Sequence, residues 1–541
     1  MSLPRFFSRV ADAIQPVAAI SPPALAKHLE QTTVAIHAPS SAENNPADSD
    51  AALLAVNLAA RLYPQLHLSG PTIWTECAAA LAEAINPGAD IDRAAKAPAA
   101  TNVVTLDWSG HPARSAHGPI VTVGADGWNA RVDPRETSQQ QPAAPLAALA
   151  AATLGVAEVF RVVFAEALGQ RGRRDRQPGG FNLITSGEPS DAAPTPTSTP
   201  RLPDAHLVGA GAVGQACLLA LRATGIPTNL TVVDPESVEL SNLQRYALAA
   251  DGDVGVAKTE LAARATIGSA VTVIPVPTVW GADRRSGPAT AYVVLTALDS
   301  PADRLAVAAG LPGRAYNAWT QPADVGWSRH EHFGSEPCLA CLYYPDRPRP
   351  NEHELIASAL RQPALRILSY LITHTPVGAP LPLITTVPDL PPPPDASTWT
   401  SQPLLDDLVE LGFLMSGDTS QWAGKHVDQL YRDGICAGGI IRLPGSADSE
   451  AALVPLAHQS ALAGIMLATS YIAGSHDALR RHRPSQIEAR FDLLRGFPQT
   501  LTRPRARTSG CLCSDSFYLD AAHERWDRGW CVMENPSQDH K

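Results

Sequence analysis

The chain lacks several features that would place it in a functional class at once. It has no excess of positive charge, because its formal net charge is -11, which argues against a nucleic-acid-binding surface as its main function. Its eight cysteines are too few for a disulfide framework in 541 residues. No run of 18 apolar residues is present, and the amino-terminal stretch lacks the apolar core of a signal peptide. We therefore expect a cytoplasmic protein with neither nucleic acid nor a membrane as a partner.

The length predicts two or three domains. Two segments are of low complexity. Residues 186–203 are rich in Pro, Ser and Thr and are typical of a linker, and residues 388–397 contain four consecutive prolines. The first residues, MSLPRFFSRVADAIQ, are expected to form a helix docked on the protein, with an amphipathic helix on a membrane as the alternative. The 49 prolines and abundant alanine suggest a bacterial protein.

The amino-terminal half, residues 1–185, alternates strand and helix patterns. LHLSG is followed by an Ala-rich helix pattern, PIVTVGADGWNARVD predicts a hairpin, and residues 145–168 have apolar residues at helical spacing. LHLSG corresponds in this pattern to HLVGAG of the second half. The first half is therefore expected to be a degenerate copy of the second that lost its phosphate-binding glycines, and an unrelated α/β domain is the alternative.

A glycine-rich turn opens the second half. HLVGAGAVG is an apolar strand followed by Gly209, Gly211 and Gly214 in the spacing G-x-G-x-x-G, and a helix pattern follows. Such glycines let the backbone approach a phosphate at a helix N-terminus. Asp234 ends the next strand, where a carboxylate can bind ribose hydroxyls. These residues alone also allow a nicotinamide-dependent dehydrogenase.

The residues after Asp234 favour a different chemistry. Asn242, Arg245 and Lys258 follow in a polar context, together with Glu236. Hydride transfer needs no such set of cations, whereas cleavage between the α- and β-phosphates of a nucleotide must hold the charge of three phosphates. With its glycine loop, D-x-E-x-V, S-N-L-x-R and D-V-G-x-x-K patterns, the chain resembles the ThiF/MoeB/ubiquitin-activating superfamily.

The resemblance implies a role for each matching residue. MgATP would lie on the loop from Gly209 to Gly214, with Gly211 approaching the phosphates. The other implied contacts are Asp234 to the ribose, Asn242, Arg245 and Lys258 to the triphosphate, and Asp299, in AYVVLTALDSPADRLAVA, to magnesium. Glu236 ranks below Asp234 as a nucleotide contact, because it could only cap a turn. Arg304 could equally be solvated or paired with Asp303 or Asp299.

Four cysteines occur as two close pairs, Cys338 with Cys341 and Cys511 with Cys513. Four thiolates suit a closed, tetrahedral structural zinc site, and the resembled family pairs an early C-x-x-C with a late cysteine pair. Reduced, buried thiols are the alternative. Cys217 and Cys77 are expected in the core, and Cys531 has no interpretable context.

Cys436 lies apart from these pairs, between glycines in YRDGICAGGIIRL. A thiol in an exposed loop is more accessible than one in an apolar run. Family members that bond covalently to a protein substrate carry their reactive cysteine in or before a crossover loop, so Cys436 is the candidate nucleophile. Residues 346–432 form an insertion with two helix patterns, PALRILSYLITH and SQPLLDDLVELGFL. The cysteine follows this insertion, whereas ubiquitin-activating enzymes usually carry it near the start.

The resulting expectation is an α/β protein with two tandem Rossmann-like, ThiF-type domains. The first is degenerate, and the second carries the helical insertion and the zinc site. The active domain would comprise residues 204–345 and, after the insertion, 433–541. The resemblance implies ATP, Mg²⁺ and Zn²⁺ as cofactors and ATP-dependent adenylation of a ubiquitin-like protein, then a thioester and transfer to a conjugating enzyme.

Such enzymes occur in bacterial conjugation systems of anti-phage defence operons. A sulfur-carrier adenylyltransferase of thiamine or molybdopterin synthesis and a non-catalytic nucleotide-binding scaffold stay open as alternatives. The sequence also leaves a homodimer open.

Overall fold

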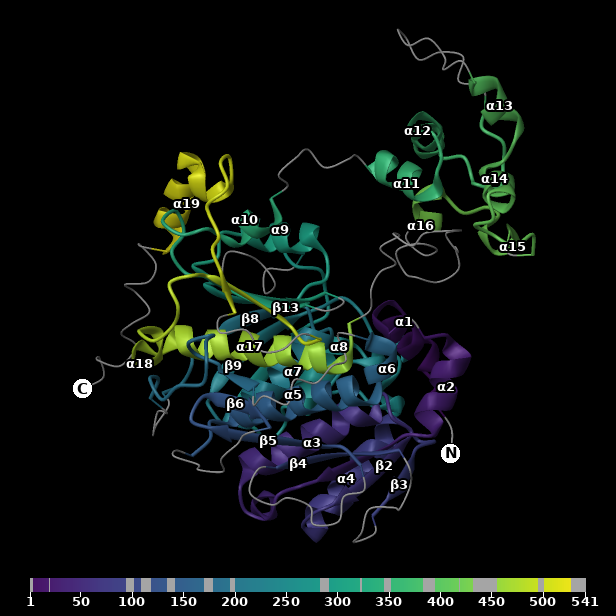
Figure 1. The fold of residues 1–541 in the computed structure, drawn as a ribbon. Coiled ribbons are helices and arrows are strands. Elements are labelled where there is room, and N and C mark those ends of the chain that lie inside the picture. Colours follow the sequence, from purple (N-terminus) through teal and green to yellow (C-terminus); the bar gives the residue numbers. More distant parts are fainter. Residues whose placement is uncertain are drawn as a thin grey trace. The chain divides into compact units, whose positions relative to one another are not determined.

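The fold is seen in a computed structural model (Figure 1). The chain divides into two compact units, one of Met1–Tyr344 with Val454–Lys541 and one of Pro345–Leu453. The residues described are 3–18, 20–93, 102–108, 118–133, 142–169, 179–194, 200–282, 291–321, 324–344, 352–382, 395–417, 419–431, 455–494 and 501–526.

The first sheet has seven strands in the order β3-β2-β1-β4-β5-β6-β7. The strands from β3 to β5 are parallel, and β6 and β7 join antiparallel. The predicted hairpin is confirmed, because β5 pairs antiparallel with β6. The strands are β1 (Thr33–His37), β2 (Gln65–Ser69), β3 (Asp90–Asp92), β4 (Val103–Trp108), β5 (Ile120–Asp126), β6 (Asn129–Val132) and β7 (Gly179–Asn182).

The second sheet has eight strands in the order β10-β9-β8-β11-β12-β13-β14-β15. Its first five strands in that order are parallel and its last three antiparallel. The strands are β8 (Ala205–Val208), β9 (Thr228–Val233), β10 (Val271–Val276), β11 (Val293–Thr296), β12 (Arg314–Thr320), β13 (Asp324–His330), β14 (Glu488–Asp492) and β15 (Thr502–Arg503).

The two mixed sheets follow the same succession of strands, so this is an α/β fold with two similarly ordered sheets. The order corrects one expectation. LHLSG forms β2, which has the place of β9, whereas β1 has the place of β8. Local pattern cannot reveal this, because every parallel strand followed by a helix gives the same signal.

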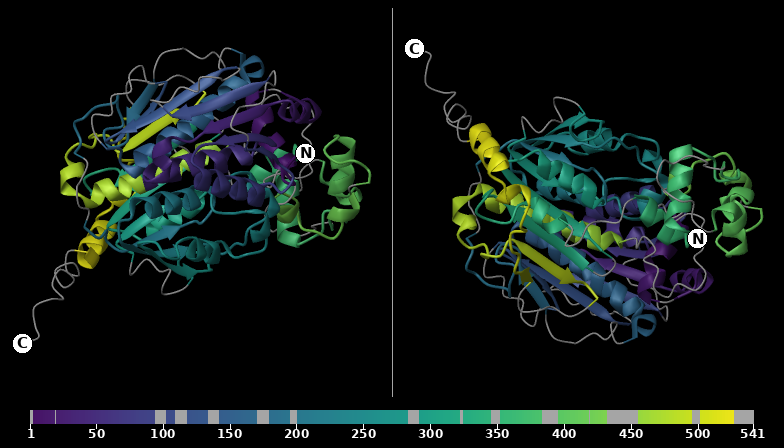
Figure 2. Two further views of the ribbon diagram at one scale, coloured as in Figure 1. Left: turned by 90° about the horizontal axis from the view of Figure 1, so that it is seen from below. Right: turned by 90° about the horizontal axis from the view of Figure 1, so that it is seen from above.

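Helices lie between the two sheets (Figure 2). α5 (Pro145–Val163) packs against α3 (Pro46–Ala60) and against β5, and α17 (Ala457–Ser475) packs against both α5 and α7 (Ala212–Thr224). α4 (Thr72–Ile85) contacts α3, and the short α6 (Ala165–Leu168) follows α5. One large apolar cluster therefore spans both sheets.

α5 is the helix that the sequence predicts within residues 145–168. Its 19 residues are apolar enough and long enough to cross a membrane. However, 89% of its apolar window is buried inside the protein, as in the core helix of a water-soluble fold.

The amino terminus forms α1 (Phe7–Ala18) and α2 (Pro22–Glu30). Val10 and Ile14 of α1 are buried, so the expected docked helix is confirmed.

Shorter helices complete this unit. α8 (Lys258–Ala265) contacts β10, and α10 (Leu339–Tyr343) contacts α9 (Pro301–Ala309). α18 (Asp477–Arg480) follows α17, and α19 (Ser516–Trp526) is the last helix described.

The unit Pro345–Leu453 is helical in its described residues and has an apolar core of its own, which includes Ile367, Tyr370 and Leu408. The two predicted helices are present as α12 and α14. The helices are α11 (Glu352–Leu360), α12 (Ala364–Thr373), α13 (Ala396–Ser401), α14 (Leu404–Glu410), α15 (Thr419–Trp422) and α16 (Val427–Tyr431).

Candidate active site

The glycine-rich turn joins β8 to α7. Gly209 has a φ of +96°, and a Cβ there would lie 2.5 Å from the carbonyl oxygen of Ala297. A Cβ at Gly214 would overlap the carbonyl of Gly209, so this glycine lets the helix start close to the strand. Gly211 caps α7, and a Cβ there would meet only Tyr246 Oη, at 3.5 Å. Its glycine therefore leaves space above the helix N-terminus, where an anion binds favourably.

Asp234 follows β9 and is buried. Its carboxylate accepts hydrogen bonds from the backbone N–H of Ala210 (2.7 Å) and of Glu236 (2.9 Å). Burial raises the pKa of Asp234, and Lys258 and these two hydrogen bonds oppose that effect. The carboxylate thus fixes the glycine loop against the end of β9, the position at which the sequence predicts a ribose contact.

The S-N-L-x-R segment forms a short 3-10 helix, Leu240–Gln244. Asn242 caps it, because its Oδ1 accepts a hydrogen bond from Glu239 N (2.9 Å). Arg245 ends the segment and is half-buried. Burial lowers the pKa of Arg245, Tyr246 and Asp299 raise it, and Arg9 lowers it further. A guanidinium in such an environment is well placed to receive an anion.

Lys258 begins α8, and its side chain is 5% exposed. Its ammonium forms an ion pair with Glu236 and lies 5.3 Å from the centre of the Tyr246 ring. Burial would lower the pKa of Lys258, but Tyr246, Asp234 and Glu236 together raise it, so the side chain stays cationic. Glu236 itself is exposed and acts here as the partner of the lysine.

Asp299 is exposed and lies between β11 and α9, where a carboxylate can bind a hard cation such as Mg²⁺. Arg304 corrects one of the two sequence alternatives, that of a solvated side chain. It is buried, donates hydrogen bonds to the carbonyls of Leu298 and Ala318, and stacks 5.0 Å from the centre of the Tyr343 ring. Arg304 therefore supports the turn that carries Asp299.

These predicted residues gather at the carboxyl ends of β8, β9 and β11, the edge of an open α/β sheet at which ligands bind. Electrostatic interactions connect Lys258 with Asp234, and Arg245 with Asp299. The arrangement offers a glycine loop, two cations and a carboxylate to one polyanionic ligand.

Sequence reasoning missed two side chains here. Tyr246 lies directly after Arg245, so its place next to the S-N-L-x-R pattern could have indicated that it belongs to the site. Arg9 comes from α1, and only the fold brings it close enough to affect the pKa of Arg245. Two neighbouring guanidinium groups repel each other, and an anion between them removes that cost.

The four paired cysteines lie together in the fold, although Cys338 and Cys511 are 173 positions apart in the sequence. Their sulfur atoms are all within 4.8 Å of one another, and four of the sulfur–sulfur separations lie between 3.5 and 4.0 Å. Tetrahedral zinc with Zn–S bonds of about 2.3 Å needs sulfur separations of about 3.8 Å. The cluster therefore fits a structural tetrathiolate metal site, with no open position for catalysis.

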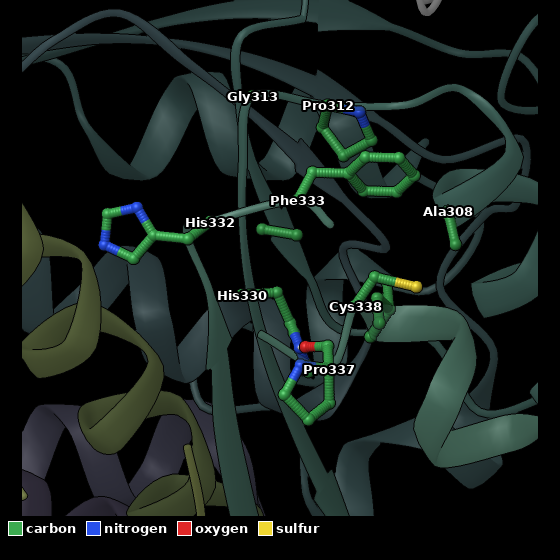
Figure 3. A pocket seen from close by; sticks show the side chains of 10 residues that line it. Ala308, Pro312, Gly313, His330, His332, Phe333, Pro337 and Cys338 are labelled. Atoms are coloured by element: carbon green, nitrogen blue, oxygen red, sulfur yellow. The ribbon is translucent and has the colours of Figure 1, made fainter. Parts of the chain in front are cut away.

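A buried histidine lies next to the cysteine cluster. His330 is buried, and its ring nitrogens lie within hydrogen-bond distance of Ser328 Oγ (3.0 Å) and Pro337 O (2.8 Å). Pro337 directly precedes Cys338. Burial lowers the pKa of His330 to about 4, so the ring is neutral. A pocket beside it, about 20 Å³ in volume, holds little more than one water (Figure 3). It is no substrate site.

The remaining cysteines differ in environment. Cys217 is buried, as expected, and burial raises the pKa of its thiol. Cys77 was expected in the core, which is wrong: it lies on the exposed side of α4, because Ala78 and Ala82 form the buried side. Cys436 and Cys531 lie outside the described residues.

Two family models match parts of this chain. Residues 204–475 match the ThiF family, and residues 33–175 match the BilD N-terminal domain. A protein of Sinorhizobium fredii (strain NBRC 101917 / NGR234), named "Uncharacterized protein y4jF", is 34% identical over 499 residues, covering 90% of this chain and 89% of the relative.

Two solved structures are similar over a smaller part. Escherichia coli MccB with MccA-N7isoASN is 19% identical, with a TM-score of 0.23, over 30% of this chain and 50% of that one. E. coli tRNA N6-threonylcarbamoyladenosine dehydratase, TcdA, is 28% identical, with a TM-score of 0.17, over 20% and 46%. The chain thus spans about half the length of each.

Proposed function

The chain belongs to the ThiF family of adenylyltransferases, and we propose that it is the activating enzyme of a bacterial ubiquitin-like protein. Membership of the ThiF family supports ATP-dependent adenylation as the general reaction. The identity of the acceptor as the C-terminal carboxylate of a ubiquitin-like protein is the proposal. The match of the amino-terminal half to the BilD N-terminal domain, which is tied to bacterial ubiquitin-like conjugation, supports it.

In the first step, ATP lies with its phosphates above Gly211 and the N-terminus of α7. A carboxylate oxygen of the partner attacks the α-phosphorus, and the bond to the β-phosphate oxygen breaks. Pyrophosphate leaves and an acyl adenylate remains. Lys258 and Arg245 neutralise the charge on the phosphates, and positioning replaces a general base. Asp299 would hold Mg²⁺, which when bound neutralises further phosphate charge.

In the second step, the thiolate of Cys436 attacks the acyl carbon of the adenylate. The carbon–oxygen bond to AMP breaks, AMP leaves, and a thioester forms. The acyl group then passes to the cysteine of a conjugating enzyme. The position of Cys436 between the two zinc-type cysteine pairs supports this assignment.

The observation that carries the proposal is the grouping of Arg245, Lys258 and Asp299 at the glycine loop. A passive scaffold would also need cations for the phosphates, but cleavage makes further charge develop there, so the complete set of two cations and a metal-binding carboxylate favours catalysis. The amino-terminal sheet repeats the strand order without the glycines, which supports its expected place as an inactive copy.

The test is ATP–pyrophosphate exchange with the purified chain and a ubiquitin-like protein ending in Gly-Gly that is encoded beside it. We expect exchange only when this partner is present, and no exchange when its last two glycines are removed. Exchange without any thioester would favour the sulfur-carrier alternative. If the chain bound MgATP without any exchange, the scaffold alternative would replace the proposal.

A further inference from the structure

One arginine of the amino-terminal half is buried against the loop that carries Arg245. Arg61 directly follows α3 and is 1% exposed. Its Nη2 donates to the carbonyl of Ala249 (2.9 Å), and its Nη1 donates to the carbonyl of Leu243. The guanidinium therefore binds the loop on both sides of Arg245, although Arg61 lies more than 180 residues earlier in the sequence.

Asn57, one turn earlier in α3, binds both Arg61 and the same loop. Its Oδ1 accepts a hydrogen bond from Arg61 Nε (3.0 Å), and its Nδ2 donates to the carbonyl of Ala247 (2.9 Å). In the second half of the protein, the side chain of Gln215 on α7 accepts a hydrogen bond from Leu248 N (3.1 Å). The segment 243–249 is thus tied to both halves of the protein.

The charge of Arg61 is unusual for such a place. Among the described residues, its acceptors are two backbone carbonyls and one amide oxygen, which are all neutral. Burial lowers the pKa of Arg61 to about 9, because a buried site disfavours the charged form. Apolar side chains of similar volume often stabilise a fold as well as buried ionic groups do. What the guanidinium adds at that cost is two hydrogen bonds to the loop and one to Asn57.

We propose that Arg61 is a positioning residue for adenylation, which with Asn57 fixes the backbone on both sides of Arg245. It holds that guanidinium and the neighbouring Tyr246 in the geometry that receives the phosphates, so that the inactive half acts on the nucleotide site. A flexible loop would have to be ordered at each binding event, whereas a fixed loop avoids this cost. The inference rests on the proposed function.

The experiment compares Arg61→Met, which removes the donors, with Arg61→Lys, which keeps a charge but cannot bond both carbonyls. The control is Arg161→Met, because Arg161 is likewise buried but is paired with Glu158 (2.6 Å) on α5. Hydrogen–deuterium exchange of residues 240–250 and the affinity for MgATP are measured on the full chain. Both Arg61 variants should speed exchange there and weaken MgATP binding by about tenfold, as expected for loss of one or two hydrogen bonds.

Arg161→Met should lower the melting temperature without either effect. Unchanged exchange in residues 240–250 of the Arg61 variants would overturn the proposal. So would faster exchange with unaltered MgATP affinity, or equal losses in the Arg161 control. If Arg61→Met does not fold, Arg61→Lys carries the test. If the parent chain itself does not bind MgATP, the proposed function fails and the proposal fails with it. The exchange data would then still show whether Arg61 orders the loop.

Discussion

The sulfur atoms of Cys338 and Cys511 lie 3.5 Å apart, although 173 residues separate them in the chain. This contact ties the segment that follows β13 to the segment that follows β15. Four thiols in this arrangement, without disulfide geometry, suit a metal that binds them as thiolates. Such a metal would stabilise this end of the second sheet.

The first prediction is that the purified chain carries about one zinc per molecule through this site. Cys511→Ser should carry almost none and should melt at least about 5 °C lower, because the bound metal stabilises only the folded chain. Cys77→Ser, in the exposed position on α4, is the control and should keep its zinc. Elemental analysis and thermal unfolding measure both effects. A metal-free parent of unchanged stability would show that the cysteines are ordinary thiols.

Asp299→Ala tests the metal contact of the adenylation step. Without this carboxylate, partner-dependent pyrophosphate exchange should fall by at least about 100-fold, since charge neutralisation at the phosphates supplies a large part of the catalysis. Asp303→Ala, four residues later at the start of α9, is the matched control and should retain most of the exchange. Exchange at the parent rate in Asp299→Ala would remove the residue from the site.

Arg9 brings a second guanidinium to Arg245 from the amino-terminal half. Arg9→Ala should raise the KM for ATP by about tenfold, because an anion between the two cations would lose one partner. Arg5→Ala is the control, since Arg5 pairs with Asp251 (2.9 Å) and is 65% exposed. Steady-state exchange at varied ATP concentration measures the difference. Equal kinetics in both variants would contradict a nucleotide contact for Arg9.

The sequence predicts those parts of the site that depend on local spacing. The glycine turn, Asp234 and the S-N-L-x-R segment lie within about one βαβ unit, in which short-range geometry places them. Arg9, Arg61 and Asn57 could not be predicted. They reach the loop only because the two halves pack together, and no short spacing records contacts between distant segments.

Two errors have the same origin. LHLSG was matched to the wrong strand, because periodicity identifies strands but not their order in a sheet. Cys77 is exposed although the sequence predicts it in the core, and the many small residues of α4 give little indication of which helix face is buried. The strand order and the helix face both depend on what packs alongside.

Stability should depend on pH through His458, which is buried on α17 with its ring 5.6 Å from that of Phe160. Burial lowers its pKa to about 3, from 6.5 in the unfolded chain. Between these two pKa values the unfolded chain binds more protons at His458 than the folded chain does. The contribution of His458 to the free energy of unfolding is therefore fully present above pH 6.5 and is lost as the pH falls toward 3. Each pH unit below 6.5 should cost about 1.4 kcal/mol.

His458→Leu removes this contribution, so between pH 7 and pH 5 it should lose about 2 kcal/mol less than the parent. The matched control is His332→Leu, because His332 is exposed and its side chain points away from the pocket (Figure 3). Urea unfolding at both pH values measures the difference. Parallel losses in His458→Leu and the parent would mean that His458 is not the acid-sensitive group.

The last prediction separates the two chemical steps at Cys436, whose role rests on the sequence. The thiolate attacks the adenylate and contacts no phosphate. Cys436→Ala should therefore keep partner-dependent pyrophosphate exchange and lose the reductant-sensitive adduct with the ubiquitin-like protein. Cys436→Ser should form an ester that survives reductant. A reducible adduct in Cys436→Ala would assign the nucleophile to another thiol, with Cys531→Ala the next variant to test. Loss of exchange as well would give Cys436 a structural role in its loop, because adenylation precedes any thiol chemistry.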